Sequence, residues 1–258
     1  MISVNEILQI KVIPQYPRKV VISWDIGQEL PYPLAFNIYR SGSSGGEFEK
    51  LNQFPFTEFF YEDLGLKPLS KLLQINYKLE IIFPTGESQL TNPISIVPRP
   101  RLKKAFFVAR RMDQKYGIEY NSHTGIELKV FKRRHWGEKC TSCFNPVTES
   151  STNSNCPDCL GTTFKKGFWE GIPTLGKIDP KVLTQNLDPN LSFVENINAQ
   201  MSLRAFPLVK KGDVIVNVTS NVRWYVNTVQ LTEHTLFPVK QTVEVREIER
   251  SSILYSLK

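Results

Sequence analysis

The 258-residue chain is 41% hydrophobic and contains 16 Phe, 9 Tyr and 4 Trp, which excludes a disordered chain and allows one or two buried cores. No run approaches the ~18 consecutive apolar residues of a membrane span, and the N-terminal residues lack the basic start and cleavage site of a signal peptide. We therefore expect no membrane association and a protein that is made and assembled in a cytoplasm.

The formal net charge of +7 is concentrated in one segment. Residues 99–139 hold twelve Lys and Arg against four Asp and Glu, a local net charge of +8, which leaves −1 for the rest of the chain. A local excess of this kind predicts an acidic or polyanionic neighbour. The candidate residues for contact with another subunit or with DNA are Lys103, Lys104, Arg110, Arg111, Lys132, Arg133 and Arg134.

Residues 1–97 read as short strands with the spacing of a β-sandwich. VVISWDI, AFNIYRS and NYKLEIIF are rich in β-branched and aromatic residues and are bounded by turn residues. Trp24 is expected to fill the core. The order of Trp24, Tyr39, Leu66 and Tyr77 resembles a fibronectin type III domain, and the alternative is another sandwich of the same class. The resemblance implies a tyrosine corner, in which the Tyr77 phenol bonds to upstream backbone.

The Pro-rich stretch VPRPR predicts a domain boundary after residue 97, followed by a second domain over 98–258 that starts with one helix over residues 100–116. Apolar residues recur three and four positions apart along this helix, and Gly117 suits its C-terminal cap. Its basic face is interpreted either as an ordinary solvated face or as one that contacts anions.

The rest of the second domain is predicted as a strand over residues 125–136, an extended arm over 170–205 and a small β-barrel or sandwich over 206–258. Three consecutive cations at 132–134 would put charge on both faces of the strand, since side chains alternate. The strand is therefore expected at a sheet edge or an interface. The cations then either contact a neighbouring subunit or DNA, or protect the edge against aggregation.

All four cysteines lie in the ribbon segment, residues 138–164, as two Cys-x-x-Cys pairs: Cys140, Cys143, Cys156 and Cys159. Each pair can direct two thiolates at one tetrahedral centre, and two pairs complete the four-sulfur site that zinc prefers. The intervening FNPVTESSTNSN is polar and rich in turn residues, so it cannot build a core of its own. The spacing predicts one structural Zn²⁺.

Other interpretations of the cysteines are disulfides, a redox motif and an iron–sulfur cluster. Disulfides are disfavoured in a chain without export signals, and a redox pair would accompany a βαβ unit. The paired spacing favours zinc over a cluster. The stretch CPDCLGT also resembles one unit of a chaperone zinc repeat, but it occurs once and carries Thr163 in place of the final Gly. His135 would be a fifth ligand, so we assign it a surface or structural role.

A site with four protein sulfurs is closed, so it holds structure and does not activate water. The sequence shows no Ser/His/Asp order, no recognisable carboxylate pair and no phosphate-binding glycine loop. We therefore expect that the protein is not an enzyme.

The stretch LKVFKRRHWGEKCTSCFNPVTESSTNSNCPDCLGTTFKKGFW resembles structural proteins of tailed bacteriophages, in which a basic strand meets a four-cysteine ribbon. The C-terminal stretch from KKGDVIVNV onward resembles the barrel of head-closure, or head–tail connector, proteins. This resemblance implies a virion structural protein that forms a homo-oligomeric ring in the neck and is assembled in the host cytoplasm. The implied partners are neighbouring neck, portal or adaptor and tail proteins, with non-specific contact to packaged DNA.

Two other functions stay open at this point. One is a tail, baseplate or fibre-attachment protein of the same virion, on which a fibronectin-type module would also serve as an exterior decoration. The other is a zinc-ribbon protein that binds nucleic acid, which would bind DNA with an affinity that falls steeply with salt.

Overall fold

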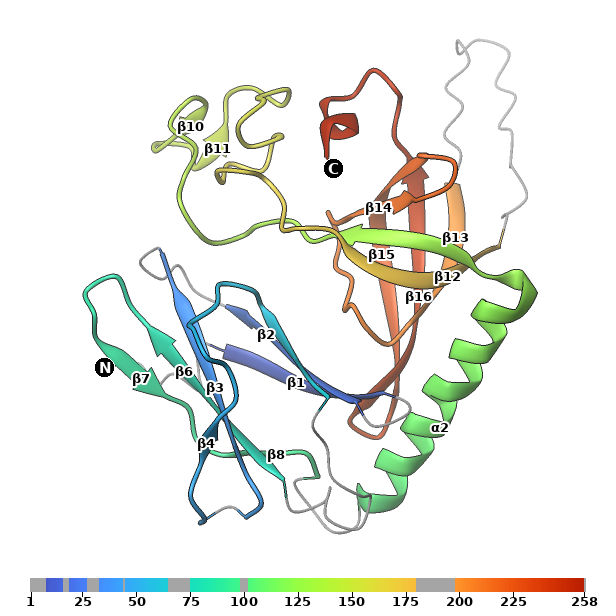
Figure 1. Cartoon of the computed structure of the whole chain (residues 1–258). Coiled ribbons are helices and arrows are strands. Elements are labelled where there is room, and N and C mark those ends of the chain that lie inside the picture. The colour runs from blue at the N-terminus through green and yellow to red at the C-terminus, as the bar shows by residue number, and fades with distance from the viewer. Residues whose placement is uncertain are drawn as a thin grey trace. The chain divides into compact units, whose positions relative to one another are not determined.

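The computed structural model describes residues 8–15, 19–26, 33–43, 45–64, 75–97, 102–179 and 198–257. The chain divides into two compact units (Figure 1). The first unit comprises residues 1–114 with 135–139 and 234–237, and the second comprises 115–134, 140–233 and 238–258. The predicted fold class is confirmed: the chain is mainly β, with a sandwich, one α-helix in the described residues, a ribbon and a closed barrel.

The first unit contains two antiparallel sheets. One has the strand order β1-β2-β5, and the other has the order β4-β3-β6-β7 with β8 paired to β6. The strands are β1 (Leu8–Gln15), β2 (Lys19–Ile26), β3 (Ala35–Ser41), β4 (Glu49–Lys50), β5 (Phe60–Asp63), β6 (Asn76–Ile82), β7 (Ser88–Leu90) and β8 (Ile94–Ser95).

Alternating side chains of these strands form the sandwich core. In β6, Tyr77, Leu79 and Ile81 are buried, whereas the residues between them are partly exposed. Trp24 is also buried, and its ring centroid lies 5.2 Å from that of Phe36. The expectation that Trp24 fills the core is confirmed.

The tyrosine corner differs from the one that the sequence resemblance implies. The Tyr77 hydroxyl donates to the Asp63 carboxylate at 2.6 Å, and Arg40 pairs with the same carboxylate at 3.0 Å. Burial and the neighbouring Asp63 raise the pKa of Tyr77, so the phenol stays a neutral donor. The hydroxyl therefore reaches a buried carboxylate and not upstream backbone, because Asp63 ends β5 beside it.

Helix α2 spans Lys103–Glu119 and continues as one π-helical turn, η3 (Tyr120–Thr124). The predicted helix over 100–116 is thus shifted, and residues 98–101 lie outside the described residues. Gly117 is not a cap but lies inside the helix, where an added Cβ would sit 3.6 Å from the Arg204 guanidinium carbon. The chain leaves the helix at Gly125, where a Cβ would collide with the Tyr120 carbonyl. No helix among the described residues has the length and apolarity to cross a membrane.

The second unit contains a closed six-stranded barrel with the order β12-β13-β16-β15-β14-β9, in which β9 also pairs with β12 (Figure 1). Its strands are β9 (Ile126–Phe131), β12 (Ile172–Asp179), β13 (Asn198–Arg204), β14 (Val214–Asn217), β15 (Arg223–His234) and β16 (Phe237–Glu247). Its core includes Leu128, Val130, Met201, Leu203, Ile215, Trp224, Val226, Val243 and Val245. A 3-10 turn, η4 (Ile253–Ser256), follows β16.

Two predicted boundaries are corrected by this barrel. The barrel is not confined to residues 206–258, because β9 contributes a strand from before the ribbon. The predicted arm over 170–205 contains two barrel strands, β12 and β13, and its central residues 180–197 lie outside the described part of the chain. The ribbon is therefore an insertion between two neighbouring strands of one barrel.

Candidate metal centre

The ribbon is fastened where it leaves and re-enters the barrel. The Arg134 N–H donates to the Gly167 carbonyl at 3.0 Å, and the Trp169 N–H donates to the Lys132 carbonyl at 2.8 Å. These bonds pair residues 132–134 with residues 167–169, a two-sided connection that we call the stem. Because the stem joins both ends of the insertion, the ribbon can hold its position while its interior has no apolar core.

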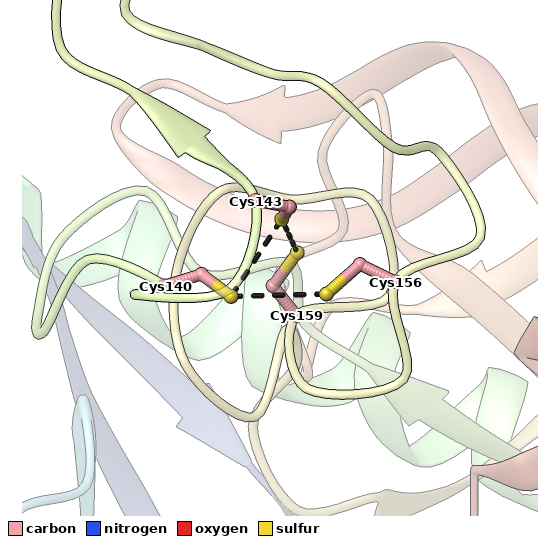
Figure 2. A group of neighbouring side chains, drawn as sticks. All are labelled: Cys140, Cys143, Cys156 and Cys159. Atoms are coloured by element: carbon pink, nitrogen blue, oxygen red, sulfur yellow. Dashed lines mark hydrogen bonds between the residues drawn. The ribbon is translucent and has the colours of Figure 1, made fainter.

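Four sulfur atoms converge inside the ribbon (Figure 2). Cys140, Cys143, Cys156 and Cys159 are all free thiols with at most 5% exposure, and their sulfurs lie within 4.8 Å of one another. The Cys143 sulfur is 3.6 Å from that of Cys140 and 3.2 Å from that of Cys159, and the sulfurs of Cys140 and Cys156 are 3.8 Å apart. The predicted ligand residues therefore form one buried cluster that suits a single metal ion.

The two cysteine pairs form the same local turn. The Phe144 N–H donates to the Cys140 carbonyl at 3.2 Å, and the Leu160 N–H donates to the Cys156 carbonyl at 2.8 Å. Each bond spans four residues and brings both thiols of its pair to one side. The hydroxyl of Ser142, in the first turn, donates to the carboxylate of Asp158 at the equivalent place in the second. The short strands β10 (Phe144–Asn145) and β11 (Ser150–Ser151) pair between the turns.

Hydrogen bonds to the sulfurs favour thiolates. The backbone N–H groups of Cys159 and Asp158 lower the pKa of the Cys156 thiol to about 7. The Ser151 hydroxyl donates to the Cys143 sulfur at 3.2 Å and lowers the pKa of that thiol, but burial and the neighbouring thiols raise it to about 12. The neighbouring thiols therefore disfavour the thiolate form of Cys143. A bound cation would favour the thiolate form instead.

Left-handed backbone conformations shape the second turn. Gly161 has φ +76° and Gly167 has φ +64°, and an added Cβ would lie 2.8 Å and 2.5 Å from the carbonyl oxygens of Ser154 and Cys159. Thr163 adopts φ +75°, although it carries a branched side chain. Thr163 therefore occupies a position that favours glycine, which agrees with its place in the repeat that the sequence resembles.

We expect Thr163→Gly to stabilise the ribbon by roughly 0.5–1 kcal/mol. A left-handed conformation costs a residue with a Cβ about 1–2 kcal/mol, and the added freedom of glycine in the unfolded chain offsets part of the gain. Slower hydrogen–deuterium exchange of the amides in residues 140–167 would show it. The control is Thr162→Gly, which removes the hydroxyl that donates to the Cys159 carbonyl at 2.8 Å and is expected to speed exchange. Faster exchange in Thr163→Gly would contradict the strain argument.

The three consecutive cations lie in the stem and not in a strand, because β9 ends at Phe131. Lys132 is buried, and its ammonium pairs with Asp213 at 2.5 Å. The Arg134 guanidinium lies 3.8 Å from the centre of the Trp169 ring, and its Nε donates to the Phe168 carbonyl. The expectation of a surface contact is therefore wrong for Lys132, whose partner is a buried carboxylate of the same chain.

Sequence reasoning missed the part that Asp213 plays. Besides Lys132, it accepts the Arg133 N–H at 2.8 Å and the Lys210 N–H at 2.7 Å, and it is fully buried. Asp213 directly precedes β14, so it ties the start of that strand to the stem. No local signal marks it, because Lys132 lies 81 residues away along the chain.

The remaining predicted cations lie on α2. Lys103, Lys104 and Arg111 are exposed, and Arg110 is partly buried. They are on a different element from the cysteines and are not ligands of the sulfur cluster. Their contact with a subunit or with DNA stays a prediction.

No protein-family model matches the chain, and no curated protein matches it. Among solved structures the chain is similar to the pectate lyase Pel3 from Pectobacterium carotovorum, with 17% identity and a TM-score of 0.29. That match covers 35% of this chain and 27% of the lyase, and at this TM-score it carries no argument. The sulfur cluster and the barrel that carries it are therefore the observations from which function has to be inferred.

Proposed function

We propose that the ribbon binds one structural Zn²⁺ through Cys140, Cys143, Cys156 and Cys159. Zn–S bonds of ~2.3 Å in a tetrahedron require sulfur atoms about 3.8 Å apart. The Cys140–Cys156 distance of 3.8 Å equals this value, the other two distances are shorter at 3.6 and 3.2 Å, and all four sulfurs lie within 4.8 Å of one another. The donor set of four thiolates with backbone N–H groups aimed at Cys156 is also the one that zinc prefers.

Such a site would cross-link the two cysteine turns of the ribbon and would not catalyse a reaction. Four protein ligands leave no open position on the metal for water or substrate. The ion would join the two turns, whose shared buried cluster consists of the four cysteines themselves, and would give the ribbon a fixed shape. A rigid, polar projection on a barrel suits a contact surface better than a reaction centre.

We propose that the protein is a structural subunit of a tailed-bacteriophage virion, in a neck ring that links the portal or adaptor to the tail. The observation that carries this proposal is the four-cysteine ribbon inserted between neighbouring strands of a closed barrel. It agrees with the sequence resemblance, which joins a basic stretch, a cysteine ribbon and a connector-like barrel in that order. In a ring, each subunit would use two different surfaces for its two neighbours.

Labelling of phage particles tests the neck position. Antibodies raised against the purified chain are expected to mark the junction between head and tail in electron micrographs of intact particles. Label on the tail tip or fibres would instead support the tail or baseplate alternative. Absence of the chain from purified particles, together with salt-sensitive binding of the free chain to DNA, would overturn the proposal in favour of a nucleic-acid-binding protein.

A further inference from the structure

One face of α2 carries a stripe of exposed cations and aliphatic residues. Lys104, Val108, Arg111, Lys115 and Ile118 recur at alternating intervals of four and three, the spacing of a helix seam that packs on a partner. At 3.6 residues per turn they fall within an arc of about 80°. We call this set the α2 stripe. All five are exposed, including Val108 at 38% and Ile118 at 60%.

The other face of the helix is the one that packs within the chain. Ala105, Phe106, Ala109 and Asp113 are buried, and they lie opposite the α2 stripe. Among the residues that the structure describes, no acidic group pairs with Lys104, Arg111 or Lys115. Within the described ranges, the packing of α2 therefore leaves its cationic, partly apolar side exposed.

The start of α2 carries a charge that does not favour the helix. Lys103 and Lys104 occupy the first turn, which has no acidic residue. The positive end of the helix macrodipole disfavours cations there. The two lysines therefore do not stabilise the start of the helix. An acidic partner would explain their presence there.

Exposed side chains of complementary character lie on the first unit, in the stretch of chain that runs from the edge strand β4 to the end of β5. Glu47, Glu49 and Glu58 are exposed, and no cation pairs with them among the described residues. The same stretch exposes Phe54 at 73%, and Leu64 follows at 70%. We call residues 47–64 the acidic edge. The cation within it, Lys50, already interacts with Glu80, whose pKa is lowered mainly by hydrogen bonds from Asn37 and Tyr39 and less by the charge of Lys50.

We propose that the α2 stripe of one copy binds the acidic edge of the next copy. The match has two parts: unpaired cations meet unpaired carboxylates, and Val108 and Ile118 meet Phe54 and Leu64. Since the two surfaces differ, the contact is heterologous, and repeating it generates a closed ring or a filament. This inference rests on the proposed ring and names the surfaces that its subunits use.

The apolar residues favour a protein occupant over DNA. Cations supply most of the free energy of binding to a phosphate backbone. Aliphatic side chains such as Val108 and Ile118 contribute nothing to such binding. A second copy cannot use its own α2 stripe, because like charges would face each other. The acidic edge supplies negative charge to pair with the cations of the stripe and exposed apolar side chains to pack against Val108 and Ile118.

Charge reversal on each surface tests the contact. The stripe variant is Lys104→Glu with Arg111→Glu and Lys115→Glu, and the edge variant is Glu47→Lys with Glu49→Lys and Glu58→Lys. Mass photometry and analytical ultracentrifugation of the full chain would follow self-association. Each variant alone is expected to weaken it by at least about tenfold, with a smaller difference at high salt.

Mixing the two variants distinguishes a specific contact from general repulsion. The stripe variant keeps a native acidic edge and the edge variant keeps a native stripe, so the mixture is expected to associate although neither variant does so alone. The reversed stripe and the reversed edge are also complementary, so the two variants should alternate in the larger species. A chain that carries both reversals should self-associate again, because the two surfaces are complementary once more. The matched control reverses three exposed cations without ion pairs among the described residues, Lys129, Lys166 and Lys211, and should associate as the wild type does.

Two further measurements complete the test. Val108→Ser with Ile118→Ser leaves the charge unchanged and is expected to weaken association, which a purely electrostatic surface would not show. A wild-type chain that stays monomeric at ~100 µM in low salt would overturn the inference, as would a mixture of the two variants that does not associate. If the stripe variants still self-associate but no longer bind duplex DNA, the α2 stripe is a DNA-binding surface and the inference is wrong. Labelling of the particle neck does not depend on any of these outcomes, so the ring contact and the proposed function fail separately.

Discussion

Replacing Asp213 with Ala is expected to destabilise the barrel by about 3–5 kcal/mol, because it leaves the buried Lys132 ammonium without a counter-charge. The change also leaves the backbone N–H groups of Arg133 and Lys210 without their acceptor, because both donate to the same carboxylate. These groups sit where β14 begins and the stem starts, so both the barrel closure and the ribbon attachment should loosen. Faster hydrogen–deuterium exchange in β9 and β14 and a lower urea midpoint would measure the effect.

Two further variants separate the buried charge from its surroundings. Lys211→Ala removes an exposed neighbouring cation that has no ion pair within the described part of the chain, and should change stability by less than about 0.5 kcal/mol. Asp213→Asn with Lys132→Met removes both charges and keeps an acceptor for a backbone N–H. We expect the double variant to recover part of the stability lost in Asp213→Ala. A loss of less than about 1 kcal/mol in Asp213→Ala would show that water or a rearranged side chain replaces the carboxylate.

The same ion pair shows why the basic stretch was misread from the sequence. A run of three cations is usually exposed, and the alternation rule assumes that the strand continues through all three. The strand ends at Phe131, however, and Lys132 turns inward to a partner 81 residues away. Local patterns carry no information about such a partner, so only the fold could assign Lys132 an internal role.

The barrel boundaries were missed for a related reason. β12 has the sequence IPTLGKID, with Pro and Gly and no clean alternation of apolar and polar residues. At Gly176 an added Cβ would lie 2.5 Å from a Leu203 methyl group and 2.9 Å from one of Leu128, so a side chain at this position would force these two buried leucines to shift. A strand with glycine at an inward position resembles an irregular arm in the sequence, although the side chains that face this position from the neighbouring strands, Leu128 and Leu203, are buried in the core.

The sulfur cluster, in contrast, was fully predictable in its residues. Its geometry depends on two local turns with the same spacing, and each turn closes through a hydrogen bond between residues four apart. Short-range rules are sufficient for such a site. The sandwich core was predictable to the same extent, since the alternation in β6 is carried by consecutive residues.

Changing Cys156 to Ser is expected to abolish metal binding and unfold the ribbon, which is the largest effect that the structure predicts. Wild-type protein purified under reducing conditions should contain one zinc per chain by elemental analysis, and the variant should contain almost none. Binding of structural zinc contributes on the order of 10–16 kcal/mol in small zinc domains, and here site formation and ribbon folding are the same event. Without the ion, residues 140–167 have a buried cluster of thiols and little apolar surface to replace it.

The barrel should survive this loss, because its core of Leu128, Trp224, Val243 and the residues around them contains no part of the ribbon. Exchange protection is therefore expected to vanish in residues 140–167 and to persist in β13 and β16. The matched control is Ser151→Ala, which removes the hydrogen bond to the Cys143 sulfur together with those to the Asn153 backbone, and should keep the zinc at a cost of about 1 kcal/mol for each bond lost. Iron in place of zinc, or a Cys156→Ser variant whose ribbon amides stay protected, would contradict the proposed site. In the second case the three remaining thiols and the introduced serine would pack as a core without metal, so the ribbon would not depend on an ion for its fold.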